Sequence, residues 1–123
     1  MLYLSENKEI MATLFTKIIK REIPAKIVYE TEKVLAFQDI HPQAPHHILI
    51  VPKVEIATIN DLTPATAPVI GDLFLAAKEI ASQLGVSERG YRVVMNCNEG
   101  AGQSVFHIHL HFLAGRDFHW PPG

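Results

Sequence analysis

Three histidines alternate with apolar residues near the C-terminal end of this 123-residue sequence. They are His107, His109 and His111. Successive side chains on a strand point to opposite faces, so the spacing predicts three imidazoles on one face, about 6.5–7 Å apart, and apolar side chains on the other. A solvent-exposed face would more often carry Thr, Lys or Glu. The pattern therefore indicates a site with a chemical role.

Two kinds of chemistry fit such a row of imidazoles. Histidine is a common zinc ligand, although imidazoles on one straight strand do not converge easily on a tetrahedral centre about 2.0–2.1 Å away. Alternatively, the central imidazole of His109 attacks phosphorus or carbon as a nucleophile, while neighbouring groups orient it. The residues by themselves leave both interpretations open.

The rest of the sequence predicts the elements that would position these histidines. A short amphipathic helix is expected over residues 13–21. A longer helix is expected to begin at Thr63-Pro64 and to end at Leu84, with Gly85 as its stop. Short apolar runs predict strands at residues 26–30, 34–40, 47–51, 91–95 and 104–113. Because these strands come in neighbouring pairs, we expect an α+β fold with an antiparallel sheet.

Length and composition limit the classes of protein that fit. With 48% hydrophobic and 20% charged residues, the chain resembles an ordinary globular protein. We expect a single domain over residues 13–123 and a flexible extension over residues 1–12. A formal charge of −2 gives no basic excess for nucleic acid, and no apolar run is long enough to span a membrane. A single cysteine and no secretory signal favour the cytoplasm.

The string from His107 to Leu113 resembles the signature of the histidine triad family, in which three histidines alternate with hydrophobic residues. Other segments resemble the histidine triad nucleotide-binding (Hint) branch, and the likeness extends from about Leu14 to Gly123. These segments are residues 15–19, 21–25, 36–40, 42–45, 102–104 and 119–123. A histidine at the third triad position, His111, differs from the glutamine of the uridylyltransferase branch.

This resemblance implies a fold and an activity. The fold is α+β, with a five-stranded antiparallel sheet and two helices, and two copies form a homodimer with one continuous ten-stranded sheet. The activity is hydrolysis of purine nucleoside phosphoramidates, of the adenosine 5′-monophosphoramidate or aminoacyl-adenylate type, through a nucleotidyl-histidine intermediate. No metal or other cofactor is expected. The expected partners are purine nucleoside monophosphate derivatives and a second copy of the chain, without nucleic acid or membrane.

The resemblance also implies roles for the candidate catalytic residues. His109 would attack the α-phosphorus, and the main-chain carbonyl of His107 would orient its ring. His111 would donate a hydrogen bond to a phosphate oxygen, and His47 would lie beside the triad. Ser104 would donate to the phosphate or to the leaving group.

A second set of residues is implied in nucleotide binding. Asp39 would accept hydrogen bonds from the ribose hydroxyls. An apolar slot around the base is expected from Phe15, Ile18, Phe37 and Ile40. The other implied residues are Asn96, Gly102, Gln103 and, on a tail that reaches the partner's active site, Trp120.

Three other functions stay open at this point. One is dinucleoside polyphosphate hydrolysis, which the tail ending Trp-Pro-Pro-Gly and the Gly-Gln-Ser motif at residues 102–104 argue against. Another is a nucleotide-binding regulatory or scaffold module, and a third is a zinc-dependent hydrolase. Some relatives hold a structural zinc with a Cys-x-x-Cys pair, but Thr13 and Thr16 occupy the matching positions here, so no such zinc is expected.

Overall fold

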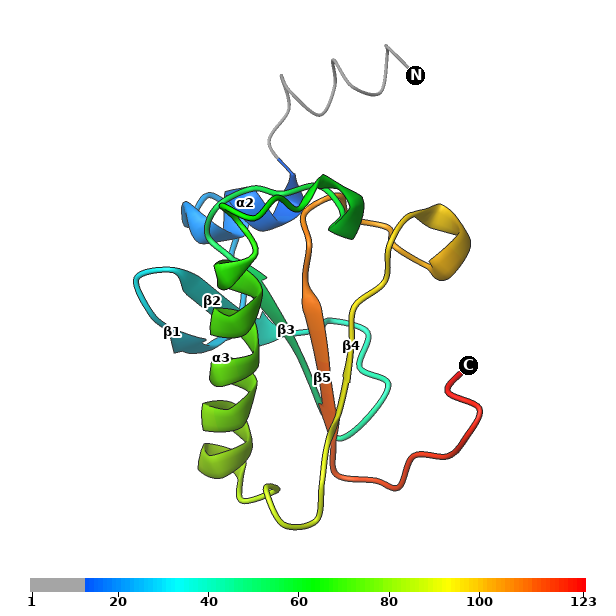
Figure 1. Ribbon diagram of the computed structural model, residues 1–123. Coiled ribbons are helices and arrows are strands. Elements are labelled where there is room, and N and C mark those ends of the chain that lie inside the picture. Colours follow the sequence, from blue (N-terminus) through cyan, green and yellow to red (C-terminus); the bar gives the residue numbers. More distant parts are fainter. Residues whose placement is uncertain (1–12) are drawn as a thin grey trace.

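A five-stranded antiparallel sheet forms the centre of the protein in the computed structural model, which describes residues 13–123 (Figure 1). In chain order its strands are β1 (Ile27–Glu30), β2 (Val34–Gln38), β3 (His46–Pro52), β4 (Arg92–Val94) and β5 (Leu110–Ala114). The spatial order is β1-β2-β3-β5-β4, and every neighbouring pair is antiparallel. The expected α+β class is confirmed, whereas the extension expected over residues 1–12 lies outside the described residues.

Two helices pack on opposite faces of this sheet (Figure 1). The helical segments are α2 (Leu14–Ile19), α3 (Pro68–Leu84) and the short 3-10 helices η1 (Ile59–Asp61) and η2 (Glu99–Ala101). On β2, Val34 and Ala36 belong to the core beneath α3, whereas Leu35 and Phe37 pack with α2. The alternation of side chains along a strand explains why all four are buried. Among residues 13–123, no helix has the length and apolar character that a membrane span requires.

The start of α3 differs from the prediction. The sequence predicts a helix from Thr63-Pro64, but the first regular helical residue is Pro68. Before it lies a separate turn in which the Ala67 amide donates to the Thr63 carbonyl at 2.8 Å. Proline has no amide hydrogen, and its ring clashes with the carbonyl four residues earlier, so regular helix does not run through Pro68. The other end is as predicted, because Gly85 has a φ of 71° and caps the helix.

The strand that carries the histidines is shorter than predicted. The sequence predicts a strand over residues 104–113, but β5 pairs with β3 only from Leu110 onward. Beyond that point β3 ends in Pro52, which has no amide hydrogen to offer a neighbouring strand. Its carbonyl oxygen lies 2.7 Å from the ring nitrogen Nε2 of His107. His107 and His109 therefore lie on an irregular segment, and only the third histidine lies on the strand.

Candidate active site

His107 is completely buried and hydrogen-bonded at both ring nitrogens. A carbonyl oxygen can only accept, so Nε2 carries the proton and donates to the Pro52 carbonyl at 2.7 Å. Burial lowers the pKa of His107, which keeps the ring neutral and leaves a lone pair on Nδ1. That nitrogen lies 3.3 Å from Thr13 Oγ1 and 3.4 Å from Thr16 Oγ1. Because both of its nitrogens are hydrogen-bonded to the protein, this ring has a structural role and cannot act as the nucleophile.

One ring nitrogen of His109, Nδ1, is hydrogen-bonded to the main chain, and the other, Nε2, makes no hydrogen bond within residues 13–123. Its Nδ1 lies 2.8 Å from the His107 carbonyl oxygen and donates to it. Burial lowers the pKa of His109 more than this hydrogen bond raises it, so the ring is neutral near pH 7. The proton is held on Nδ1, and Nε2 keeps its lone pair. Phe15 of α2 packs edge-on against the ring, with a centroid separation of 4.9 Å. A neutral imidazole held in this way can act as a nucleophile.

His111 is in the opposite tautomer because of His47. The Gln43 amide donates to Nδ1 of His47 at 3.0 Å. Burial lowers the pKa of His47, so its ring is neutral and its single proton is on Nε2. That nitrogen lies 3.0 Å from Nδ1 of His111 and donates to it. His111 then holds its own proton on Nε2. The rings of His109 and His111, 5.0 Å apart, thus offer a lone pair and an N–H side by side.

A cavity of about 640 Å³ opens beside these rings. His47, His109 and His111 line one part of it. Most of the remaining wall is apolar and consists of Leu14, Phe15, Ile18, Ile23, Phe37, Ile40, Leu49 and Val105. Small-molecule sites are commonly cavities of about 300–1,000 Å³ with apolar walls and a few convergent polar groups. The histidine cavity fits that description.

Asp39 lines the same cavity, directly after β2. Its Oδ1 accepts a hydrogen bond from the His41 amide at 2.7 Å, which fixes the carboxylate. Its Oδ2 lies 3.5 Å from Nε2 of His47. The side chain is 19% exposed, so a ligand in the cavity can reach it. A fixed carboxylate with free acceptor capacity suits a pair of ligand hydroxyls.

The structure brings most of the predicted site residues to this one cavity. They are Phe15, Ile18, Phe37, Asp39, Ile40, His47, Ser104, His109 and His111. They come from α2, β2, β3, β5 and the segment before β5, which are far apart in the sequence. Their proximity results from the fold, while their assignment to catalysis or nucleotide binding stays a prediction.

Four predicted nucleotide-binding residues lie outside the lining. Gln103 is buried, and its side chain binds the main chain of the loop, donating to the Ala57 carbonyl at 2.7 Å. A Cβ added to Gly102 would lie 3.8 Å from the side-chain nitrogen Nδ2 of Asn96, so these two residues are close in space. Trp120 is 83% exposed. Gln103 supports the loop that leads to Ser104, and the other three do not reach the cavity within this chain.

Sequence reasoning missed several residues of the site. Leu49 lines the cavity and follows His47 by two positions on β3, so the period of two could have revealed it. Val105 precedes His107 by two positions, so the same period could have revealed it, although the segment is irregular in the structure. Ile23 lies in an irregular segment and carries no such pattern. Gln43 acts through its main-chain amide, which no side-chain pattern can reveal.

Asp39, His47 and His111 could hold a metal by their positions alone, since one donor atom of each lies within 4.8 Å of the others. Coordination by His47 would use Nε2, which lies between the other two donors. A metal-bound imidazole normally donates from its second nitrogen. Here that nitrogen, Nδ1, instead accepts from the Gln43 amide, so the proton is on the nitrogen that the metal would need. The donor set therefore favours a hydrogen-bonded chain over a metal ligand set.

Acid should destabilise the folded protein, because His111 resists protonation in it. Burial, followed by repulsion from His109 and His47, lowers the pKa of His111 to about 4 from an ordinary 6.5. Between these two values the unfolded chain binds a proton that the folded chain does not, so stability present above pH 6.5 is lost as the pH falls toward 4. We expect the free energy of unfolding to drop by about 2 kcal/mol between pH 7 and pH 4.5.

Urea titrations at fixed pH measure this loss. A His111→Gln variant is the control, because it should show a smaller difference between the two pH values. An unfolding free energy that is the same at both pH values in the unmodified protein would contradict the prediction.

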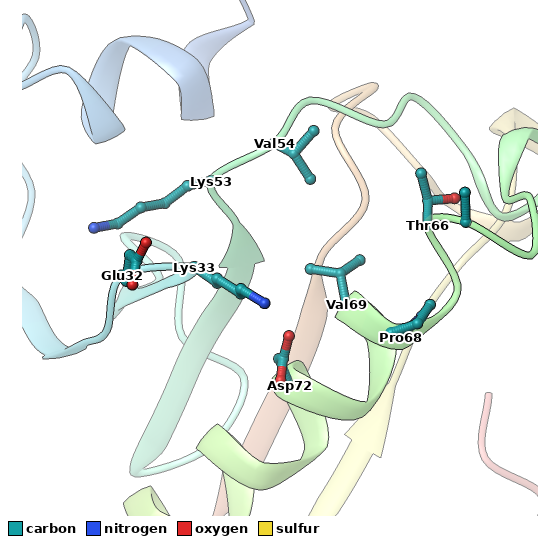
Figure 2. Close-up of a pocket in the computed structure, with 9 residues that line it drawn as sticks. Glu32, Lys33, Lys53, Val54, Thr66, Pro68, Val69 and Asp72 are labelled. Carbon is teal, nitrogen blue, oxygen red and sulfur yellow. The ribbon is translucent and has the colours of Figure 1, made fainter.

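Figure 2 shows a second cavity, of about 360 Å³, at the N-terminal end of α3. Its charged lining residues are Glu32, Lys33, Lys53 and Asp72. Lys53 already forms an ion pair of 2.7 Å with Glu30. The lining has no histidine and as many acidic as basic groups, so it offers a ligand no imidazole and no net charge. The histidine cavity is the better candidate for the active site.

Known proteins resemble this chain over most of its length. The model of the HIT domain matches residues 20–118. Purine nucleoside phosphoramidase of Escherichia coli K12 is 51% identical over 104 residues, which are 85% of this chain and 87% of that protein. A HIT-like protein of Synechocystis is 50% identical over 90% of this chain and 96% of its own length. The crystal structure of a HIT family hydrolase from Legionella pneumophila superimposes with a TM-score of 0.87 at 53% identity, covering 89% of this chain and 98% of that one. The chain therefore belongs to the histidine triad (HIT) family.

Proposed function

We propose that this protein hydrolyses the phosphorus–nitrogen bond of purine nucleoside phosphoramidates, with His109 as the nucleophile. The observation that carries the proposal is the neutral His109 ring, whose Nδ1 proton is held by the His107 carbonyl at 2.8 Å beside an apolar cavity of about 640 Å³. The 51% identity to a purine nucleoside phosphoramidase supports this choice of substrate.

The reaction proceeds in two displacements at phosphorus. In the first, Nε2 of His109 forms a bond to the α-phosphorus, the phosphorus–nitrogen bond breaks, and the leaving amine takes up a proton from solvent. The Nε2–H of His111 donates to a phosphate oxygen, and the Ser104 hydroxyl donates to the phosphate or the leaving amine. In the second, water attacks the nucleotidyl-histidine, releasing the nucleoside monophosphate and a proton and restoring the His109 lone pair.

The cavity accommodates the nucleotide in an orientation that its lining suggests. The purine base occupies the apolar slot between α2 and β2, where Phe15 and Phe37 pack edge to face at 5.4 Å. The ribose hydroxyls donate to Asp39, whose Oδ2 has acceptor capacity left. This arrangement places the phosphate beside the histidines. Ile40, 85% exposed, forms the outer edge of the slot.

Four predicted nucleotide-binding residues do not line this cavity in a single chain. Gln103 supports the loop before Ser104, and the other three make an assembly part of the proposal. Trp120 is exposed near the C-terminal end, and β4 is an edge strand of the sheet. Pairing of two β4 strands would join two sheets into one of ten strands and bring the tail of one copy toward the cavity of the other. We expect this homodimer to act in the cytoplasm, without a metal or other cofactor.

The test is hydrolysis of adenosine 5′-phosphoramidate with and without a metal chelator. The amount of adenosine 5′-monophosphate released measures the turnover. Turnover that is equal in both conditions is expected. Turnover that disappears with chelator would replace the proposal with metal-dependent hydrolysis. Cleavage of diadenosine polyphosphates but not of the phosphoramidate would move the protein to the other hydrolytic function, and tight nucleotide binding without any cleavage would indicate a regulatory or scaffold module.

A further inference from the structure

The main chain around His107 is not held by the sheet. β5 begins at Leu110, so the strand pairing that fixes His111 does not extend to His107 or His109. Among residues 13–123, the main-chain bond in this segment that connects it to another part of the protein runs from the Ile108 amide to the Ile56 carbonyl at 2.7 Å. This bond holds the Ile108 amide of the same planar peptide unit that carries the His107 carbonyl, on which the His109 ring depends. The contacts of the His107 side chain supply the second constraint on the position of that carbonyl.

The His107 side chain supplies those contacts through a chain of hydroxyl groups. The Thr16 hydroxyl donates to Glu55 Oε1 at 2.6 Å, a short bond of the kind formed to a carboxylate. Its proton is thus used, and Thr16 Oγ1 can only accept from its other neighbours. The Thr13 hydroxyl lies 3.1 Å from Thr16 Oγ1 and 3.3 Å from Nδ1 of His107, so its single proton bridges these two acceptors.

The same hydroxyls fix the start of α2. Thr13 is the N-cap residue, and its Oγ1 accepts the Thr16 amide at 3.1 Å. The next residue but one, Phe15, packs edge-on against His109 and lines the cavity. One hydrogen-bonded cluster therefore holds both the helix that forms the base slot and the histidine whose carbonyl orients the His109 ring.

We infer that Thr13, Thr16 and Glu55 are positioning residues for His109, which they act on through His107. This inference rests on the proposed function for its effect on catalysis. None of the three residues lines the cavity, so none touches the substrate. They hold the His107 ring from the side of α2 while the Pro52 carbonyl holds it from the side of β3. Loss of the hydroxyl chain removes the contacts of the His107 ring on the side of α2 and leaves the Pro52 and Ile56 contacts. The His107 carbonyl can then shift about these remaining contacts, and the His109 ring loses its single orientation.

The central test compares Thr13→Val with Thr13→Ser. Valine removes the hydroxyl at nearly constant volume, and serine retains it. A misplacement of a catalytic group by about 1 Å can cost about 100-fold in rate, so we expect kcat of Thr13→Val to fall by about 10- to 100-fold. KM should change by less than about threefold, because the substrate contacts are intact. Thr13→Ser should restore kcat to within about twofold of the unmodified protein.

Thr63→Val is the matched control. The Thr63 hydroxyl accepts the Thr66 amide at 3.3 Å in an exposed turn, the same local bond that Thr13 makes, but it has no contact with His107. This variant should lose similar local stability and keep its kcat. Glu55→Ala is a second probe, because it removes the acceptor of the Thr16 hydroxyl, and Glu55 is exposed, so its substitution does not threaten folding. It should lower kcat in the same direction as Thr13→Val.

A readout that does not depend on activity separates this inference from the proposed function. Nitrogen-15 NMR of the imidazole rings should show His109 protonated at Nδ1 in the unmodified protein and a mixture of tautomers in Thr13→Val and Glu55→Ala. If the unmodified protein shows no phosphoramidate hydrolysis but the His109 tautomer changes in the variants as expected, the positioning is right and the proposed function is wrong. If hydrolysis occurs and Thr13→Val keeps both its kcat and its His109 tautomer, the positioning inference is overturned and the proposed function stands.

Discussion

Replacing His109 by alanine should lower the turnover of adenosine 5′-phosphoramidate by on the order of 10⁴-fold or more, because the nucleophile is removed and the covalent route is closed. The neighbouring groups cannot substitute for it. His107 has both ring nitrogens engaged by the protein. His111 accepts a hydrogen bond from His47 at Nδ1, so its own proton is on Nε2 and it offers an N–H to the cavity. Single-turnover kinetics of the two proteins measures the loss.

The fate of the phosphoryl group distinguishes this role from a merely structural one. Rapid acid-free quenching followed by mass spectrometry should detect a nucleotidyl adduct on the unmodified protein and none on His109→Ala. His46→Ala is the control, because His46 precedes His47 on β3 but does not line the cavity, and its turnover should be unchanged. An active His109→Ala protein that still forms the adduct would assign the nucleophile to another residue.

Replacing Phe112 by alanine should cost about 3–5 kcal/mol of unfolding free energy, the range measured for large-to-small changes of buried aromatic residues. Phe112 has no exposed surface and belongs to the core between the sheet and α3. Its ring stacks on Tyr91 with a centroid separation of 4.9 Å. It also follows His111 directly on β5, so the cavity that its loss leaves lies beneath the active-site strand.

Phe74→Ala provides the matched comparison for that measurement. It removes the same side chain from the outer side of α3, where Phe74 is 49% exposed. Substitutions at exposed positions away from special features change stability by about 0.5 kcal/mol or less, and a half-exposed ring should cost only modestly more. Urea denaturation of both variants gives the difference. Equal losses for the two variants would mean that the core beneath β5 is not the main source of stability.

The sheet and the ends of several elements could be predicted because their signals are local. Alternation through the histidine segment predicted apolar side chains on the face opposite the histidines, and two of them, Leu110 and Phe112, lie in the core beneath α3. Gly85 was predicted to stop the long helix because a positive φ is easy for glycine, and its φ is 71°. Each of these predictions depends on a residue and its immediate neighbours.

The predictions that failed depend on contacts between distant segments. The extent of β5 is set by what stands opposite it, and Pro52 lies 55 positions away from His107 in the sequence. Periodicity continues through residues 104–113 whether or not a partner strand is present, so it could not show where the pairing ends. The start of α3 was placed too early, at Thr63-Pro64, whereas regular helix begins at Pro68, because the ring and the missing amide hydrogen of Pro68 prevent helical hydrogen bonding from continuing through it.

The candidate site was predictable in its residues and not in its hydrogen bonding. The histidine pattern and the family resemblance identified Asp39, Ser104 and the cavity-lining histidines His47, His109 and His111. They did not identify the other polar lining residues, which are Lys26, Gln38, His41 and Gln43. Nothing in the sequence indicated that the Gln43 amide would set the tautomer of His47, or that Thr13 and Glu55 would hold His107. Those contacts arise from main-chain atoms and from the approach of α2 to the end of β3.

The two imidazoles that face the cavity are chemically identical side chains, and the polarity of the backbone gives them opposite roles. The His107 carbonyl accepts a hydrogen bond from Nδ1 of His109. The Gln43 amide instead donates to His47, which in turn donates to Nδ1 of His111. Exchanging the roles of the two histidines would thus require a different course of the chain, whatever the side chains. A descendant of this protein could retain every histidine and still become inactive if the loop that supplies the Gln43 amide moved. Counting intact triads in a genome would then overestimate the number of active enzymes.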